Sequence, residues 1–230
     1  MIEFVTLFLG LFTGVQEVRL LAAPEVASIE LRLDGEAVRD AMLAVSGSLD
    51  RRMGGPGVRP PLPPDLVRTL LKNQWKVSPP EEHYRRSIYV FARRNLRYPI
   101  FEVLDRPDAN ASCPRRARST TAPQALLLLN SPLSLDAARR LAGAVAENAR
   151  GAEELVAEAT RRALSREPTR QERQLGETFL REHAQLLRGR APEQLAQPFP
   201  PPHAMHAADA AALTDYCLAL LNCNEFLYLD

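Results

Sequence analysis

Cysteine is scarce in this sequence of 230 residues, where it occurs only as Cys113, Cys217 and Cys223. So few and so scattered, these residues exclude a disulfide framework and a cysteine-rich zinc site. The sequence has no C-x-x-C and no C-x-x-C-H motif, which excludes a covalently attached haem in this chain. It also lacks H-E-x-x-H, G-x-S-x-G, P-loop and G-x-G-x-x-G motifs, so the common hydrolase and nucleotide-binding classes lose their usual support.

An excess of charge of either sign is also absent. Lys and Arg number 29 against 28 Asp and Glu, and the net charge is +1. Without a global positive field, nucleic acid is not an expected partner. The apolar stretch at residues 1–15 is too short to span a bilayer, and Glu3 stands where a signal peptide would be basic. We therefore expect neither a membrane span nor a signal peptide in this chain.

The apolar share of 46% and the charged share of 25% are typical of a globular protein. The patterning predicts a mainly α fold, an irregular multi-helix bundle with long proline-rich loops. Residues 17–21 and 28–33 alternate polar and apolar side chains about a turn near Pro24, which favours a short N-terminal β-hairpin. We therefore divide the chain into an atypical N-terminal segment, residues 1–30, and a helical domain, residues 31–230.

Apolar side chains spaced by three or four residues predict the first helices. Val38, Met42, Val45 and Leu49 define a helix from about residue 36 that Gly47 weakens near its end. Residues 53–64, with three glycines and five prolines, form a loop, and a short helix is expected over residues 65–75.

Helix-start signals predict the remaining helices. The capping-box pattern at residues 78–81 is expected to open a helix with Tyr84, Ile88 and Phe91 on one face. Capping boxes also stand at residues 121–124 and 169–172. Two further helices are expected over residues 135–150 and about 155–163, and a last one from about Asp209 carries Leu213, Cys217 and Leu220.

Residues 85–118, here called the arginine segment, are the least ordinary part of the chain. They contain nine arginines against Glu102, Asp105 and Asp108, with Tyr89, Phe91, Tyr98 and Phe101 interleaved. Between Pro107 and Pro114 the composition indicates an irregular loop.

Several stretches resemble the planctomycete-specific domain one family. They include RLDGEAVRDAML at residues 32–43, SCPRR at 112–116, STTAPQAL at 119–126 and LNCNEFLYLD at 221–230, with shorter ones at 77–81, 84–89, 93–95 and 101–108. At Cys223 the family usually has serine. The resemblance covers about residues 31–230, and residues 1–30 depart from it.

The resemblance implies which domains accompany this one rather than an activity, because no biochemical activity is assigned to that family. Such domains usually end large exported proteins that also contain c-type cytochrome domains and a second helical domain. This implies a periplasmic, envelope or extracellular location. It also implies that cytochrome c-type and other helical domains are the partners, and that haem is a cofactor of those domains and not of this chain.

The arginine segment offers a candidate anion site. Guanidinium forks and the free N–H groups of a helix N-terminus both favour phosphate, sulfate or carboxylate. The candidate residues are Arg93, Arg94, Arg97, Arg115, Arg116, Arg118 and Thr121. In the alternative interpretation the same arginines pair with Glu102, Asp105, Asp108 or the C-terminal acids and pin the loop to the core. A third interpretation, base stacking on Tyr89, Tyr98 and Phe101, conflicts with the neutral net charge.

Histidine and cysteine offer weaker signals. His203 and His206 form H-x-x-H in a Pro/Ala-rich loop that we expect to be exposed, and no metal site is predicted. Cys113 lies close to Arg115 and could be a nucleophile, yet no histidine is near it in sequence. Cys217 is expected in the core.

Two functions from different classes follow from these observations. The first is a non-catalytic structural or interaction domain of an exported protein that docks onto c-type cytochrome domains. The second is an anionic-ligand module, for example for a glycan, or an enzyme that uses the arginine segment. The first needs no catalytic group, and we predict it over the second.

Overall fold

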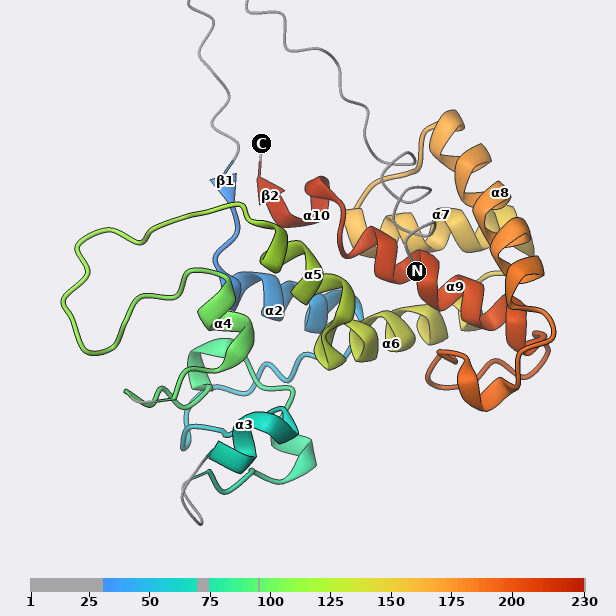
Figure 1. Ribbon diagram of the computed structural model, residues 1–230. Helices are drawn as coiled ribbons and strands as arrows, with labels where there is room; N and C mark the ends of the chain where they lie inside the picture. The colour runs from blue at the N-terminus through green and yellow to red at the C-terminus, as the bar shows by residue number, and fades with distance from the viewer. Residues whose placement is uncertain (1–30, 70–74, 95, 230) are drawn as a thin grey trace, which may run out of the picture.

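The computed structural model describes residues 31–69, 75–94 and 96–229, and they form the mainly α-helical fold that the sequence predicts (Figure 1). The helices are α2 (Gly35–Val45), α3 (Pro64–Thr69), α4 (Pro99–Val103), α5 (Ala122–Asn130), α6 (Pro132–Asn148), α7 (Gly151–Leu164), α8 (Arg170–Leu187), α9 (Ala207–Leu220) and α10 (Asn224–Leu227). Short 3₁₀ turns occur at Pro80–Glu82, Ser87–Tyr89 and Pro192–Gln194. Within these ranges no helix combines the length and apolar character that a membrane span requires.

Helix α9 is the centre of the larger helical group. It packs against α6, α7 and α8, which lie around it in Figure 1. Because neighbours cover it on several sides, α9 buries alanines and leucines all round its circumference, including Leu213 and Leu220. Cys217 is fully buried there, as the sequence predicts.

Helix α2 connects this group to the irregular half of the molecule. Val38 and Met42 are buried in the core shared with α4 and α6. The helix ends at Val45 because Gly47, at φ +72°, turns the chain into a left-handed conformation that favours glycine. Leu49, expected at the end of this helix, therefore lies beyond it.

The two ends of the described chain are joined by a short antiparallel ladder. Strand β1 (Leu31–Arg32) pairs with β2 (Tyr228–Leu229), in the register Leu31 with Leu229 and Arg32 with Tyr228. The predicted hairpin thus has one observed strand, whose partner is the C-terminus. The other expected strand, at residues 17–21, lies outside the described residues.

The prediction of a helix after residue 78 is wrong. Residues 80–91 form two 3₁₀ turns, and Ile88 is 76% exposed. In a helix Ser87 N–H would bond the His83 carbonyl, but here it donates to Asp40 Oδ1 at 2.7 Å. The His83 carbonyl instead accepts from Arg39 Nη2 at 2.6 Å. Tertiary bonds from α2 therefore replace the helical ladder.

The other predicted helices are confirmed. Helices α5 to α9 begin within a few residues of the expected positions, and Thr169 caps α8 by accepting from Glu172 N at 3.2 Å. The helix expected over residues 65–75 is observed as α3, and residues 70–74 lie outside the description.

Candidate functional site: the arginine segment

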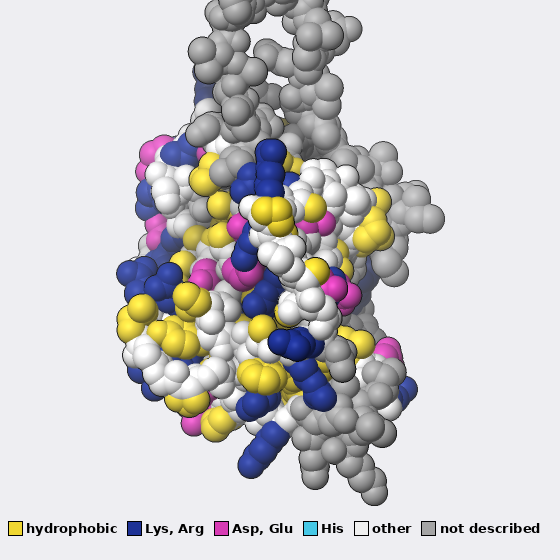
Figure 2. Space-filling view, turned by 90° about the vertical axis from the view of Figure 1, so that its left-hand side faces the viewer, with side chains coloured by type: hydrophobic (Ala, Val, Ile, Leu, Met, Phe, Trp, Pro, Cys, Tyr) yellow, Lys and Arg dark blue, Asp and Glu magenta, His cyan; other side chains and the backbone are white. Residues whose placement is uncertain are grey.

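The arginine segment includes a long loop between α4 and α5 that extends away from the helices in Figure 1. Residues 109–118 are all exposed, without helix or strand, as predicted. Figure 2 shows this side of the molecule, where basic side chains stand out from the surface with hydrophobic side chains between them. The loop leaves α4 through Asp105, a non-glycine residue at φ +65°. That conformation persists only where surrounding contacts hold it.

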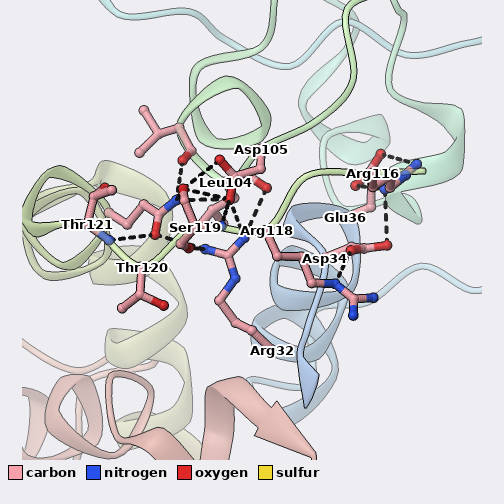
Figure 3. A network of polar contacts seen from close by, with 12 residues as sticks. Arg32, Asp34, Glu36, Leu104, Asp105, Arg116, Arg118, Ser119, Thr120 and Thr121 are labelled. Atoms are coloured by element: carbon pink, nitrogen blue, oxygen red, sulfur yellow. Dashed lines mark hydrogen bonds and ion pairs between the residues drawn. The ribbon is translucent and has the colours of Figure 1, made fainter. Parts of the chain in front are cut away.

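Buried Arg32 supplies those contacts at the base of the loop (Figure 3). Its Nη2 binds Asp105 Oδ2 at 2.7 Å, and its Nη1 donates to the Ser119 carbonyl at 2.6 Å. Asp105 also accepts from the Ser119 backbone N–H at 2.8 Å. Burial alone would raise the pKa of Asp105, but the hydrogen bonds from Ser119 and Arg32 outweigh it, and the pKa is lowered. The carboxylate is therefore the form that closes the loop.

The beginning of α5 is tied into the same network. Buried Gln124 accepts from Arg32 Nη1 at 2.8 Å and from Thr121 N–H at 3.1 Å. Its side-chain amide donates to the Val103 carbonyl at 2.9 Å, which reaches back to α4. The Thr121–Gln124 signal thus marks the helix start, as predicted. The Thr121 N–H donates to Gln124, so its hydrogen bond is made within the protein.

A second cluster holds the outer part of the loop to the start of α2, as Figure 3 also shows. Arg116 contacts Asp34 at 3.2 Å and Glu36 at 3.0 Å, and Arg118 contacts Asp34 at 3.7 Å. Hydrogen bonding to Glu36 raises the pKa of Arg116. The two acids lie at the N-cap and in the first turn of α2, where the helix dipole favours negative charge. Arg106 adds a further ion pair to Glu36 at 3.4 Å.

The other candidate residues are not gathered on this cluster. Arg97 pairs with a different acid, Asp108, at 3.1 Å. Arg94 is exposed, and its carbonyl accepts from Asn110 Nδ2 at 3.4 Å. Arg115 is also exposed, and Arg93 is partly buried.

The pairing of arginines with the chain's own acids is therefore observed for Arg97, Arg116 and Arg118. Asp108 was among the expected partners. Asp34 and Glu36 were not, and Asp105 binds Arg32, from outside the arginine segment. A composition scan of residues 85–118 could not find these partners, because they lie about 80 residues earlier in the chain. The available signal was the RLDGE stretch itself, with its arginine and two acids.

Other chemistry-bearing residues lie apart from this network. His203 and His206 are exposed, and His206 Nδ1 accepts from Ala208 N–H at 3.2 Å to cap α9. Cys113 is an exposed free thiol in the loop. Over residues 31–69, 75–94 and 96–229 no three His, Cys, Asp or Glu side chains are grouped to hold a metal ion.

Fold and network together define a small, mainly α-helical protein whose irregular segments are fixed by arginine contacts. The chain belongs to the PSD1 family, described as a protein of unknown function (DUF1553), whose model matches residues 19–180. The predicted membership in a family of unknown function is thus confirmed, whereas the matched range differs from the expected one: it begins at residue 19 and ends at residue 180. Neither the curated proteins nor the solved structures contain a match to this chain.

Proposed function

We propose that this chain is a haem-free, non-catalytic interaction domain of an exported protein. In this proposal it docks onto c-type cytochrome domains and other helical domains. The observation that supports it is the internal use of the arginine segment. Arg97, Arg116 and Arg118 bind the protein's own carboxylates, so they act as clamps that hold a long loop in one shape. A fixed, exposed loop loses little conformational entropy when a partner binds it.

The contact surface in this proposal is the outer side of the clamped loop. Arg115 in this loop is exposed, as is Arg94, whose carbonyl accepts from the loop residue Asn110, so the complementary surface on the partner carries acidic side chains. Charge complementarity of this kind raises the association rate and makes binding weaken with salt.

Titration of the purified chain against a c-type cytochrome domain exported by the same organism tests the proposal. We expect a complex whose affinity falls between low and high salt. Replacing both Arg94 and Arg115 by alanine should weaken it, while Arg190→Ala, a change at an exposed arginine after α8, should not. The proposal would be refuted if no complex forms, or if the double variant binds the cytochrome domain with unchanged affinity. The purified chain should also show no haem absorption band.

An anionic-ligand module on the same segment is the second candidate function. It is favoured by the exposure of Arg94 and Arg115 in a region with six more arginines than acids. A thermal-shift screen against sulfate, phosphate and acidic oligosaccharides separates the two functions, because a native-state ligand raises the melting temperature. A shift with one anion class that disappears in the double variant would favour this second function.

A further inference from the structure

A cavity of about 400 Å³ lies among α7, α8, α9 and α10, far from the arginine segment along the chain. This volume is within the range of small-molecule sites. Leu164, Leu175, Phe179 and Leu220 give it an apolar wall. The Tyr216 side chain and the polar residues at the start of α8 and α10 line the rest. The cavity can thus hold a molecule that is apolar at one end and polar at the other.

The polar side of the cavity carries unbalanced negative charge. Glu172 and Glu225 both line it, and Arg166 bridges them, at 2.7 Å from Glu172 and 2.6 Å from Glu225. One guanidinium against two carboxylates leaves one negative charge in this group. Each of the four carboxylate oxygens accepts a hydrogen bond from Arg166, and Glu172 also accepts from Thr169 N–H. Both side chains are partly exposed, so a ligand can reach the lone pairs that remain, chiefly those of Glu225.

Two other ionisable groups, Tyr216 and Cys223, also line the cavity. The pKa of Tyr216 is raised to about 12, mainly by burial, with the nearby charge of Glu172 adding to the effect. Burial also raises the pKa of the Cys223 thiol, again with a contribution from an acid, Glu225. Burial disfavours a charge of either sign inside the cavity, and the nearby glutamates add to the cost of a negative charge only.

We propose that this cavity binds a small organic cation, an amine carried on an aromatic or aliphatic body. The ammonium group lies beside Glu225 and Glu172, and the body packs against Leu175 and Phe179. The Phe179 ring offers the ammonium or its neighbouring methylenes a further favourable face. This inference does not depend on the docking function, because it concerns different helices.

Three probes that share one body and differ in head group test the charge preference: phenylbutylamine, phenylbutanol and phenylbutyrate. Calorimetric titration of the full chain should give affinities in the order amine, alcohol, carboxylate, with the amine ahead of the alcohol by on the order of tenfold. Equal or tighter binding of the alcohol or the carboxylate, or no binding of the amine, would overturn the proposal.

Two variants test the location. Leu175→Trp fills the cavity and should abolish amine binding, whereas Leu186→Trp, at a 67% exposed position on the same helix, should leave it unchanged. Glu225→Gln should reduce amine affinity toward the level of the alcohol. If these variants fail to fold, amide chemical shifts of the unaltered protein decide. Amine-induced shifts confined to residues around Gly176 and Glu225 support the proposal, and shifts elsewhere overturn it.

Discussion

Replacing Arg39 by methionine should loosen the irregular half of the molecule more than any exposed change. Arg39 is 1% exposed, and its fork donates to the His83 carbonyl at 2.6 Å, the Arg85 carbonyl at 2.8 Å and Ser87 Oγ at 3.2 Å. Burial lowers the pKa of Arg39, so the cation is held against a desolvation cost. Methionine has a similar length and no donor. It therefore removes the bonds while preserving much of the packing.

The expected loss of stability is about 3 kcal/mol. Each buried carbonyl left without a partner costs about 1–3 kcal/mol, and removing the buried cation returns part of its desolvation energy. Asp40, 3.7 Å from Arg39, also loses its nearest cation. The effect should be local, because the orphaned carbonyls belong to residues 83–85.

Urea unfolding followed by circular dichroism measures the loss, and hydrogen exchange locates it. Amides of residues 83–91 should exchange faster in Arg39→Met than in the unaltered chain, while those of α9 change least. The control is Arg68→Met, because Arg68 is 79% exposed and pairs with Asp65 at 3.4 Å; it should change stability by less than about 0.5 kcal/mol. Should Arg39→Met fail to fold, Arg39→Lys keeps the charge, loses the fork and should show a smaller loss. A loss below about 1 kcal/mol with unchanged exchange would refute the reasoning.

Three further predictions concern other parts of the fold. Hydrogen bonds from Arg166 lower the pKa of Glu172 to about 2, so its charged form stabilises the fold above about pH 4.5 and this contribution disappears as the pH falls toward 2. Discounted for partial exposure, this contribution to the free energy of unfolding is about 1 kcal/mol. Urea unfolding should therefore show Glu172→Gln to be less stable than the unaltered chain at neutral pH, and this difference should disappear at low pH. Gly143→Ala would drive a methyl group into the Phe199 backbone, and despite the helix-propensity gain it should destabilise by about 1–2 kcal/mol in the same assay. Cys113, the exposed thiol, should be labelled first in the native protein. Mass spectrometry should find Cys217 and Cys223, which are buried, labelled only after unfolding.

Sequence patterns predicted the elements whose stability is local. Three- and four-residue spacing placed α2 and α9, and Thr169 with Glu172 placed the start of α8, because these signals act within a turn or two. The segment after Ser78 had an equally good local signal, yet it is not helical. Ser78 Oγ accepts from Arg59 N–H at 2.9 Å and so serves another segment. Tertiary hydrogen bonds therefore outweigh the local helix propensity of this segment.

The excess of arginine in the candidate segment was visible in the sequence, but the pairing of these arginines was not. The excess of arginine over acid within residues 85–118 predicted a candidate anion site, with pairing to Glu102, Asp105, Asp108 or the C-terminal acids as the alternative. The structure brings Asp34 and Glu36 to Arg116, although they lie 82 and 80 positions earlier in the sequence. No spacing rule encodes such a contact, because it depends on where α2 packs relative to α4.

Three buried arginines explain how a chain rich in proline loops keeps a defined shape. Arg32 donates to the carbonyls of Leu104 and Ser119, Arg39 to those of His83 and Arg85, and Arg85 to those of Gly54 and Pro56. Irregular segments leave such carbonyls without ladder partners, and a buried carbonyl without a donor is costly. A planar fork with five donors can satisfy two carbonyls on one or two segments at once, while a lysine presents a single compact ammonium. Arginine at these positions is thus a requirement of the geometry, whatever sets the arginine content of the rest of the chain.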